Sequence, residues 1–205
     1  MVDIAEINSI AVANISEVNG IAIANIASVI GVDWPAAGGG DRGVFIGGYT
    51  GSATSNVIEY ITISTTGNST YFGDLIAVAA NLSSASNGGN QRAISMTANG
   101  TAQDIQYTTI NTLGNSTYFG DGMPSGDSQT GSGSVSNNTN DRIVWMGGSG
   151  FNANRTNTIS YVTATSLSNA IDFGDCLAAL RSPAPYSNGT NERGLIGGGY
   201  YNSPV

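Results

Sequence analysis

The sequence predicts an all-β protein made of small antiparallel sheets, and three observations favour this fold class. First, a phrase of Arg, an apolar run and paired glycines returns about every fifty residues, a period typical of repeat architectures. Its copies begin at Arg42, Arg92, Arg142 and Arg193. Second, glycine supplies 29 of 205 residues and only 10% of residues are charged, which suits short strands joined by turns. Third, apolar and polar residues alternate, as in half-buried strands, around Tyr60, Tyr107 and Tyr161.

Residues 1–35 form a separate apolar module with an eleven-residue repeat, in which 15–25 follows the pattern of 4–14 and 26–32 is a shortened copy. Such a period is compatible with a right-handed helical coiled coil. The dipeptide Asn19-Gly20 and the alternation of Ile with Ala favour short strands instead. A segment this short needs a partner surface, so we expect a stalk that oligomerises or docks. The alternative is a strand pair folded back onto its own domain. Residues 36–41 are predicted to be a glycine-rich linker.

The fifty-residue repeats occupy residues 42–91, 92–141 and 142–192, with a partial fourth at 193–205. Each begins with the Arg strand, continues after a polar loop into the tyrosine strand, and turns at an asparagine into an aromatic strand. That strand ends in Phe-Gly-Asp, at Phe72–Asp74, Phe119–Asp121 and Phe173–Asp175. A low-charge stretch and a polar turn close the unit. We therefore expect three or four short strands per repeat.

The order of these features resembles the kelch repeat, whose unit has an apolar run ending in Gly-Gly, then a tyrosine, then an aromatic residue. The residues that carry the resemblance are Gly47-Gly48, Tyr60 and Phe72, then Tyr107 and Phe119, then Gly147-Gly148, Tyr161 and Phe173. Phe stands where that family usually has Trp, and the second copy lacks Gly-Gly. The resemblance covers residues 42–199. It implies β-propeller blades and protein–protein interaction rather than catalysis.

The phrase Gly-Asn-Ser-Thr-Tyr-Phe-Gly-Asp, at residues 67–74 and 114–121, is similar to repeats in tail-fibre and other virion proteins of large bacterial viruses. Those proteins also resemble this chain in being poor in lysine and rich in Gly, Asn and Thr, with an apolar stalk. The resemblance implies a virion component, assembled in the cytoplasm of the bacterial host. Residues 1–35 would then bind other copies of the chain or other virion proteins.

Three repeats and one further strand are too few to close a propeller, which has about four to eight blades. The terminal strand at 195–199 must therefore complete another sheet, either in the chain's own first blade or in a neighbour's. Two chains would give six blades, whereas three sheets around a threefold axis would give a prism. We expect a homo-oligomer, either a dimer or a trimer.

Composition argues against several classes of function. The net charge is −8, and an acidic chain repels phosphate backbones, so nucleic-acid binding is not expected. The sequence has no His, no Lys and a single Cys, which removes the usual hydrolase triads, zinc sites and P-loops. We expect no cofactor and no bound metal. The chain shows no secretory signal and no apolar run of bilayer length, so we expect a soluble protein that is not inserted into membranes.

The repeated polar residues are predicted to be structural, because a catalytic group is needed once and these recur in every unit. We hypothesise that each repeated Arg bridges to a Phe-Gly-Asp carboxylate, that is, to Asp74, Asp121 or Asp175. Three tyrosines that follow the glycine pairs are candidates for sugar or protein binding, or for packing between protomers: Tyr49, Tyr200 and Tyr201. Glu59, Asp104 and Asp127 are further surface candidates. Cys176 is expected to be a small core residue.

Together these features predict a non-enzymatic virion protein of a bacterial virus, either a tail fibre or a capsid or tail decoration. Its β-repeat head would adhere to a glycan or protein of the host surface. One alternative is a glycan-cleaving, tailspike-like hydrolase, which needs two carboxylates about 5–10 Å apart in a groove. The other is a cellular kelch-type interaction module, which should carry a partner domain.

Overall fold

The structure is a computed structural model that describes residues 41–86, 91–99, 102–123, 129–136, 141–149, 155–187 and 193–201, with six short strands before them. The chain divides into two compact units, Met1–Asp41 and Arg42–Val205. In the described residues the regular structure is all strand, which confirms the predicted all-β class.

The first unit contains three antiparallel strand pairs, one for each copy of the eleven-residue repeat. They are β1 (Glu6–Ile7) with β2 (Ile10–Ala11), β3 (Glu17–Val18) with β4 (Ile21–Ala22), and β5 (Ser28–Val29) with β6 (Val32–Asp33). The pairs begin at residues 6, 17 and 28, so they keep the period of the sequence. Strands rather than a helical coiled coil therefore occupy these positions, as expected from the dipeptide Asn19-Gly20 in the sequence.

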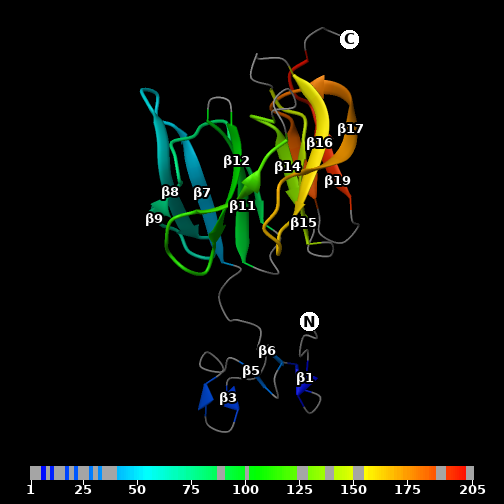
Figure 1. Ribbon diagram of the computed structural model, residues 1–205. Coiled ribbons are helices and arrows are strands. Elements are labelled where there is room, and N and C mark those ends of the chain that lie inside the picture. Colours follow the sequence, from blue (N-terminus) through cyan, green and yellow to red (C-terminus); the bar gives the residue numbers. More distant parts are fainter. Residues whose placement is uncertain are drawn as a thin grey trace. The chain divides into compact units, whose positions relative to one another are not determined.

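The described residues of the second unit form four antiparallel sheets, which follow one another in chain order (Figure 1). The first has three strands, β7 (Arg42–Tyr49), β8 (Thr54–Thr62) and β9 (Thr70–Asp74). The second has four, β10 (Ser83–Ser86), β11 (Arg92–Asn99), β12 (Ala102–Thr109) and β13 (Thr117–Asp121). The third has β14 (Gly133–Ser136), β15 (Arg142–Met146), β16 (Thr156–Thr163) and β17 (Ile171–Leu180). The fourth has only β18 (Ala184–Ser187) and β19 (Gly194–Gly197).

Each complete sheet crosses a repeat boundary, because its opening strand comes from the end of the preceding repeat. Strands β10, β14 and β18 lie in the low-charge stretches, and each pairs with the Arg strand that follows. The register is the same each time, with Ser86 opposite Ala93, Ser136 opposite Ile143, and Ser187 opposite Gly194. The first sheet has no such opening strand among the described residues.

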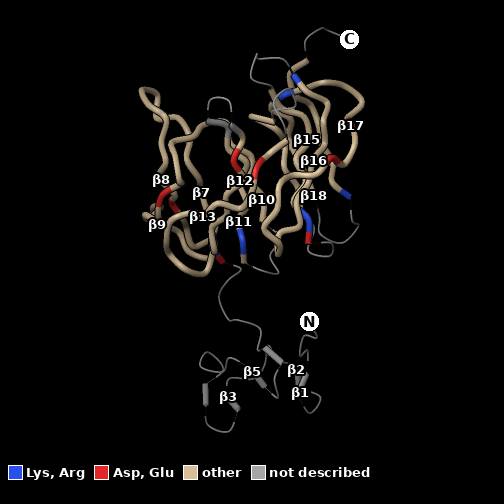
Figure 2. Tube along the Cα trace, in the orientation of Figure 1, with Lys and Arg blue, Asp and Glu red and all other residues tan. Residues whose placement is uncertain are grey.

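Two hydrophobic clusters hold the second unit together. The larger joins the second and third sheets and includes Ile94, Ile105, Phe119, Ile143, Trp145 and Val162. Trp145 is fully buried, and its indole N–H donates to the carbonyl of Ser83 at 3.1 Å. The smaller cluster, in the first repeat, comprises Ile58, Phe72, Leu75 and Ala79. Charged residues are sparse along the sheets (Figure 2), so packing and polar contacts hold the unit together.

The last strand does not pair with the first sheet of its own chain. Strand β19 pairs with β18, and within the described residues no sheet closes on itself. Of the two partners expected for the terminal strand, the chain's own first sheet is therefore wrong for this structure.

Candidate functional site

The repeated Arg, Tyr and Phe side chains form one stack in each repeat. The guanidinium carbon lies 4.9, 4.6 and 4.7 Å from the tyrosine ring centre in the pairs Arg42–Tyr60, Arg92–Tyr107 and Arg142–Tyr161. The tyrosine meets the next ring edge to face, with centres 6.0, 6.1 and 5.8 Å apart in Tyr60–Phe72, Tyr107–Phe119 and Tyr161–Phe173. Cation–π and edge-to-face contacts each contribute about 0.5–1.5 kcal/mol. These residues therefore serve the fold of each repeat.

The Arg residues also reach the following repeat, which corrects the expected Arg–Asp bridge. Arg42 donates from Nη1 to the carbonyl of Ile110 at 2.8 Å, and Arg92 donates to the carbonyl of Ala164 at 2.7 Å. Each of these two guanidinium groups thus contacts a carbonyl of the next sheet and an aromatic ring of its own sheet instead of a carboxylate. Arg142 stacks on its ring, and Arg193 is exposed beside the fourth sheet.

Two of the repeated aspartates accept a hydrogen bond from a tyrosine of their own strand, β9 or β13. Tyr71 donates its hydroxyl to Asp74 at 2.8 Å, and Tyr118 donates to Asp121 at 2.6 Å. The hydrogen bond to Asp121 raises the pKa of Tyr118 to about 12, and the bond to Asp74 raises that of Tyr71. The third repeat has Asp172 at the tyrosine position, and that carboxylate accepts from the N–H of Gly174 at 3.0 Å.

The turn asparagines link each repeat to the one before it. Asn115 accepts from the backbone N–H of Asp74 at 3.0 Å, and Asn169 accepts from that of Asp121 at 2.9 Å. Backbone bonds run alongside: Ser116 N–H donates to Asp74 at 2.9 Å, and Ala170 N–H donates to Asp121 at 2.8 Å. These two contacts between the second and third repeats therefore each have a counterpart between the first and second.

The glycine of Phe-Gly-Asp is required by the same junction. Gly73 and Gly120 are buried, and a Cβ added to either would overlap the carbonyl of the next turn, at Gly114 and Ser168 respectively. Any larger residue at these two positions would push adjacent repeats apart. Around Gly174 a Cβ meets nothing within 4 Å, because no further turn packs there.

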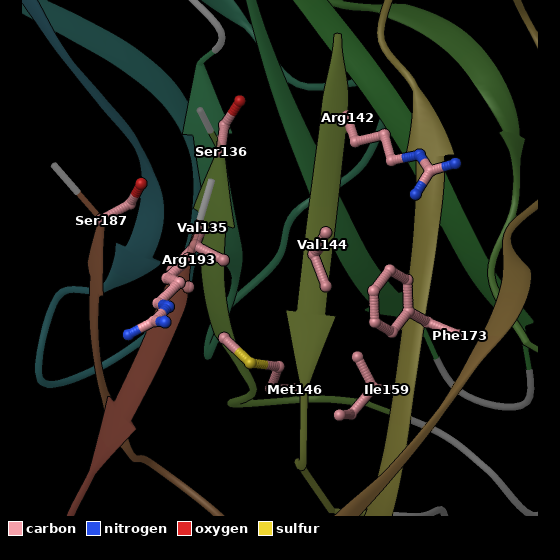
Figure 3. A pocket seen from close by; sticks show the side chains of 10 residues that line it. Val135, Ser136, Arg142, Val144, Met146, Ile159, Phe173, Ser187 and Arg193 are labelled. Carbon is pink, nitrogen blue, oxygen red and sulfur yellow. The ribbon is translucent and has the colours of Figure 1, made fainter. Parts of the chain in front are cut away.

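The face of the third repeat is open where the first two repeats are covered. Phe72 and Phe119 are 2% exposed, whereas Phe173 is 53% exposed. A hollow of about 210 Å³ lies beside it, lined by residues that include Val135, Arg142, Val144, Ile159 and Arg193. Figure 3 shows the Phe173 ring pointing into this hollow, with Ser187 and Arg193 on the opposite wall. The hollow is mostly apolar and lies between the third sheet and the two-stranded fourth sheet.

A second, polar hollow of about 400 Å³ is lined by Asn81, Thr130, Gly131, Ser149, Arg181, Ser182 and Tyr200. The guanidinium carbons of Arg155 and Arg181 lie 4.2 and 5.3 Å from the ring centre of Tyr200. The backbone of Tyr200 pairs with that of Arg181, while its side chain remains 59% exposed. Two guanidinium groups around an exposed phenol suit an acidic, hydroxyl-rich ligand.

The structure separates the three tyrosines that the sequence grouped. Tyr200 lines the polar hollow, whereas Tyr201 lines an apolar groove with Met146, Cys176 and Ile196. Tyr49 ends β7 in the first repeat and is 65% exposed.

The remaining candidates do not form a site with one another. Glu59 and Asp104 lie on β8 and β12, in different sheets, and Asp127 is outside the described residues. Cys176 is partly buried in the groove beside Tyr201 rather than in the core. Its burial raises the pKa of the thiol.

Sequence reasoning missed two buried glutamines. Gln129 is 1% exposed, donates to the carbonyls of Trp145 and Thr158, and accepts from the Ser160 hydroxyl. Gln106 accepts from the Ile76 N–H at 3.1 Å, which joins the first and second repeats. Neither glutamine has a repeated counterpart, so the sequence carried no signal for them.

Comparison with protein-family models finds no family that matches this chain, and a search of curated proteins finds no similar sequence. Within the described residues no group of three or more His, Cys, Asp and Glu side chains gathers as a metal site would require. No helix in that part of the chain is long and apolar enough to span a membrane.

Proposed function

We propose that the chain is a non-enzymatic structural protein of a bacterial virion, a tail fibre or a capsid or tail decoration, with an attachment surface on its repeats. The proposal rests on the difference between residues that repeat and serve the fold and residues that do not repeat and gather at a surface hollow. The repeated Arg, Tyr, Phe, Asn and Asp residues hold the repeats together, whereas Arg181 and Tyr200 line an open hollow without repetition and Arg155 contacts the Tyr200 ring. Binding residues are typically placed in this way, on a rigid scaffold.

The proposed architecture is an open series of kelch-like propeller blades. Strands β10, β14 and β18 would be the innermost strands, since each opens its sheet and β14 contacts both of the others. The tyrosine and aromatic strands would lie outward. The similarity of the repeat sequence to repeats in tail-fibre proteins supports the assignment to a virion.

The proposed ligand is an acidic polysaccharide or an acidic protein segment of the host surface. The chain has a net charge of −8, so Arg181 in the hollow, with Arg155 on the Tyr200 ring, makes a local exception to a repulsive surface. Thr130, Ser149 and Ser182 add hydroxyls for hydrogen bonds to a sugar. Residues 1–35 would join the chain to other copies or to other virion proteins.

Retention on immobilised polysaccharide tests this function. We expect the chain to bind polygalacturonate and the acidic surface polysaccharide of its host, not neutral dextran, and to leave both uncut. Tyr200→Ala and Arg181→Ala should lose retention, while Tyr49→Ala, which alters an exposed tyrosine away from the hollow, should keep it. Shortening of the polysaccharide would identify a hydrolase instead. Equal retention by all variants would contradict the proposed surface.

A further inference from the structure

We propose that the repeat unit assembles head to tail with a second copy of this chain, so that the first sheet of one copy completes the fourth sheet of the other. The leading face consists of the open edge of β7 with Ile63 and Gly67–Thr70. The trailing face consists of β18 with Arg142 and Phe173–Asp175. This inference rests on the proposed function, which includes self-association of the chain. It assigns that self-association to the repeats as well as to residues 1–35.

The evidence is a junction that the chain builds twice in the same way. At both junctions an Arg donates to a carbonyl of the next repeat. At both, an Asn of the next repeat accepts from the N–H of the Asp before it. At both, a glycine lies against the backbone of the next turn. A contact that recurs through this many groups is a property of the repeat, so any copy of the repeat presents it.

Each end of the series carries one half of this junction. On the leading face, Ile63 is 63% exposed, whereas its counterparts Ile110 and Ala164 are 8% and 0% exposed. Asn68 stands where Asn115 and Asn169 accept from an Asp, and within the described residues it has no such donor. On the trailing face, Phe173 is half exposed and Arg142 has no described carbonyl acceptor.

The incomplete sheets at the two ends add up to one complete sheet. The first sheet has the Arg, tyrosine and aromatic strands but no opening strand, and β18 is an opening strand without the tyrosine and aromatic strands. Strand β7 begins with Arg42-Gly43, and the matching pair is Arg193 with Gly194, the first residue of β19. Gly43 can therefore take the register opposite Ser187 that Gly194 holds here.

Strand β19 must leave β18 for this exchange, and the backbone bridge that joins Tyr200 to Arg181 just beyond β19 must open with it. Strand β19 pairs with β18 alone, and Leu195 is 61% exposed. Replacing one four-residue pairing by an equivalent one costs little, as in domain swapping. The gain is the burial of Ile63 and Phe173 together with the repeated hydrogen bonds.

Backbone hydrogen bonds also connect the residues that precede each opening strand, which have a left-handed backbone conformation. Gly131 N–H donates to Asn81 and Ser182 N–H donates to Gly131, both at 2.8 Å. All three residues have positive φ, at 56°, 65° and 52° for Asn81, Gly131 and Ser182. In the assembly, Asn81 of the second copy would donate to the carbonyl of Ser182. Leading and trailing faces differ, so the contact is heterologous and forms a ring or a filament.

Sedimentation velocity on the full chain, over a range of concentrations, tests the assembly. Ile63→Asp disables the leading face and Phe173→Asp the trailing face, and both positions are exposed enough to tolerate the change. Val78→Asp is the matched control, at a residue that is 52% exposed and outside both faces. We expect mass to rise with concentration for the wild type and the control. Each face variant should associate about tenfold more weakly or worse.

A mixture of the two face variants gives the decisive experiment, because the Ile63→Asp variant retains its trailing face and the Phe173→Asp variant retains its leading face. The equimolar mixture should gain mass that neither variant gains alone. A wild-type mass independent of concentration, face variants that behave as Val78→Asp does, or a mixture without added mass would each overturn the proposal. Any contribution of residues 1–35 to self-association is the same in the wild type and in the three variants. Because the exchange opens the bridge that holds Tyr200 in the hollow, polysaccharide retention is read in dilute solution, so the proposed function can fail while the assembly stands, or the reverse.

Discussion

The side chain of Asn115 accepts a hydrogen bond from the backbone N–H of Asp74 at 3.0 Å, although the two residues belong to different repeats. Asn169 and Asp121 form the same contact at 2.9 Å. An asparagine expected only to shape a tight turn therefore also fixes the spacing between repeats. Because the chain contains copies of this turn with and without a partner, it supplies its own control variants.

Asn115→Ala should lower the free energy of unfolding by about 1 kcal/mol, the net value of a typical hydrogen bond. Asn68→Ala, in the same turn of the first repeat, should have little effect in dilute solution because no described Asp N–H reaches it. Urea unfolding of both variants measures the difference. Equal losses would show that the asparagine acts only within its own turn.

Phe119→Ala should cost about 3–5 kcal/mol, as expected for a buried aromatic residue. Phe119 is 2% exposed in the core that joins the second and third sheets. Phe173→Ala should cost less than half as much in the dissociated chain, since Phe173 is 53% exposed. Chemical denaturation at low protein concentration checks the ratio, and similar costs would mean that Phe173 is covered in solution.

Arg92→Ala should destabilise the fold by about 1–2 kcal/mol, because it removes both a cation–π contact and a charge-assisted hydrogen bond. The side chain lies 4.6 Å from the Tyr107 ring centre and donates to the carbonyl of Ala164. Arg193→Ala is the control, since no described ring or carbonyl contacts that exposed side chain. Thermal unfolding of the two variants measures the effect. A larger loss for Arg193→Ala would place the structural role elsewhere.

Tyr118 should ionise late, because its hydrogen bond to Asp121 raises its pKa from 10.0 to about 12. The raised pKa belongs to the folded state, so the bond stabilises the fold fully below pH 10 and is lost as the pH rises towards 12. Tyr118 is 47% exposed, and solvent screening keeps this contribution small.

Phenolate absorbance titration, with Tyr118→Phe subtracted from the wild type, isolates the Tyr118 transition. Asp121→Ala should return the pKa towards 10.0, because it removes the acceptor and its charge. A Tyr118 transition near 10.0 in the wild type would show that the hydrogen bond is absent in solution.

Much of the fold could be predicted from the sequence, because alternation and turn dipeptides are local signals. The strand around Tyr107 alternates apolar and polar residues, and the hairpins of the first unit follow its eleven-residue repeat. Strands such as β10 could not be predicted, since Ser83–Ser86 is Ser-Ser-Ala-Ser and has little intrinsic strand preference. Pairing with the Arg strand, which is tertiary, makes it a strand.

The site was harder to predict because its partners are backbone groups. The shared phase of Arg and Asp indicated a structural role, yet Arg42 reaches the carbonyl of Ile110, 68 residues away. Because every residue has a backbone carbonyl, the sequence does not indicate which carbonyl accepts the hydrogen bond. The cluster of Arg155 and Arg181 around Tyr200 likewise depends on an isolated bridge between Arg181 and Tyr200 that no local pattern indicates.

Amide hydrogen exchange, resolved residue by residue by NMR, tests most directly whether adjacent repeats are joined by these recurring bonds. We expect slow exchange at the amides of Asp74 and Asp121 in dilute solution, because the side chains of Asn115 and Asn169 accept hydrogen bonds from them. Among the described residues no asparagine accepts from Asp175 in this way, so its amide should exchange faster and become protected as concentration rises. Exchange at Asp74 and Asp121 as fast as at Asp175, or an Asp175 amide indifferent to concentration, would contradict it.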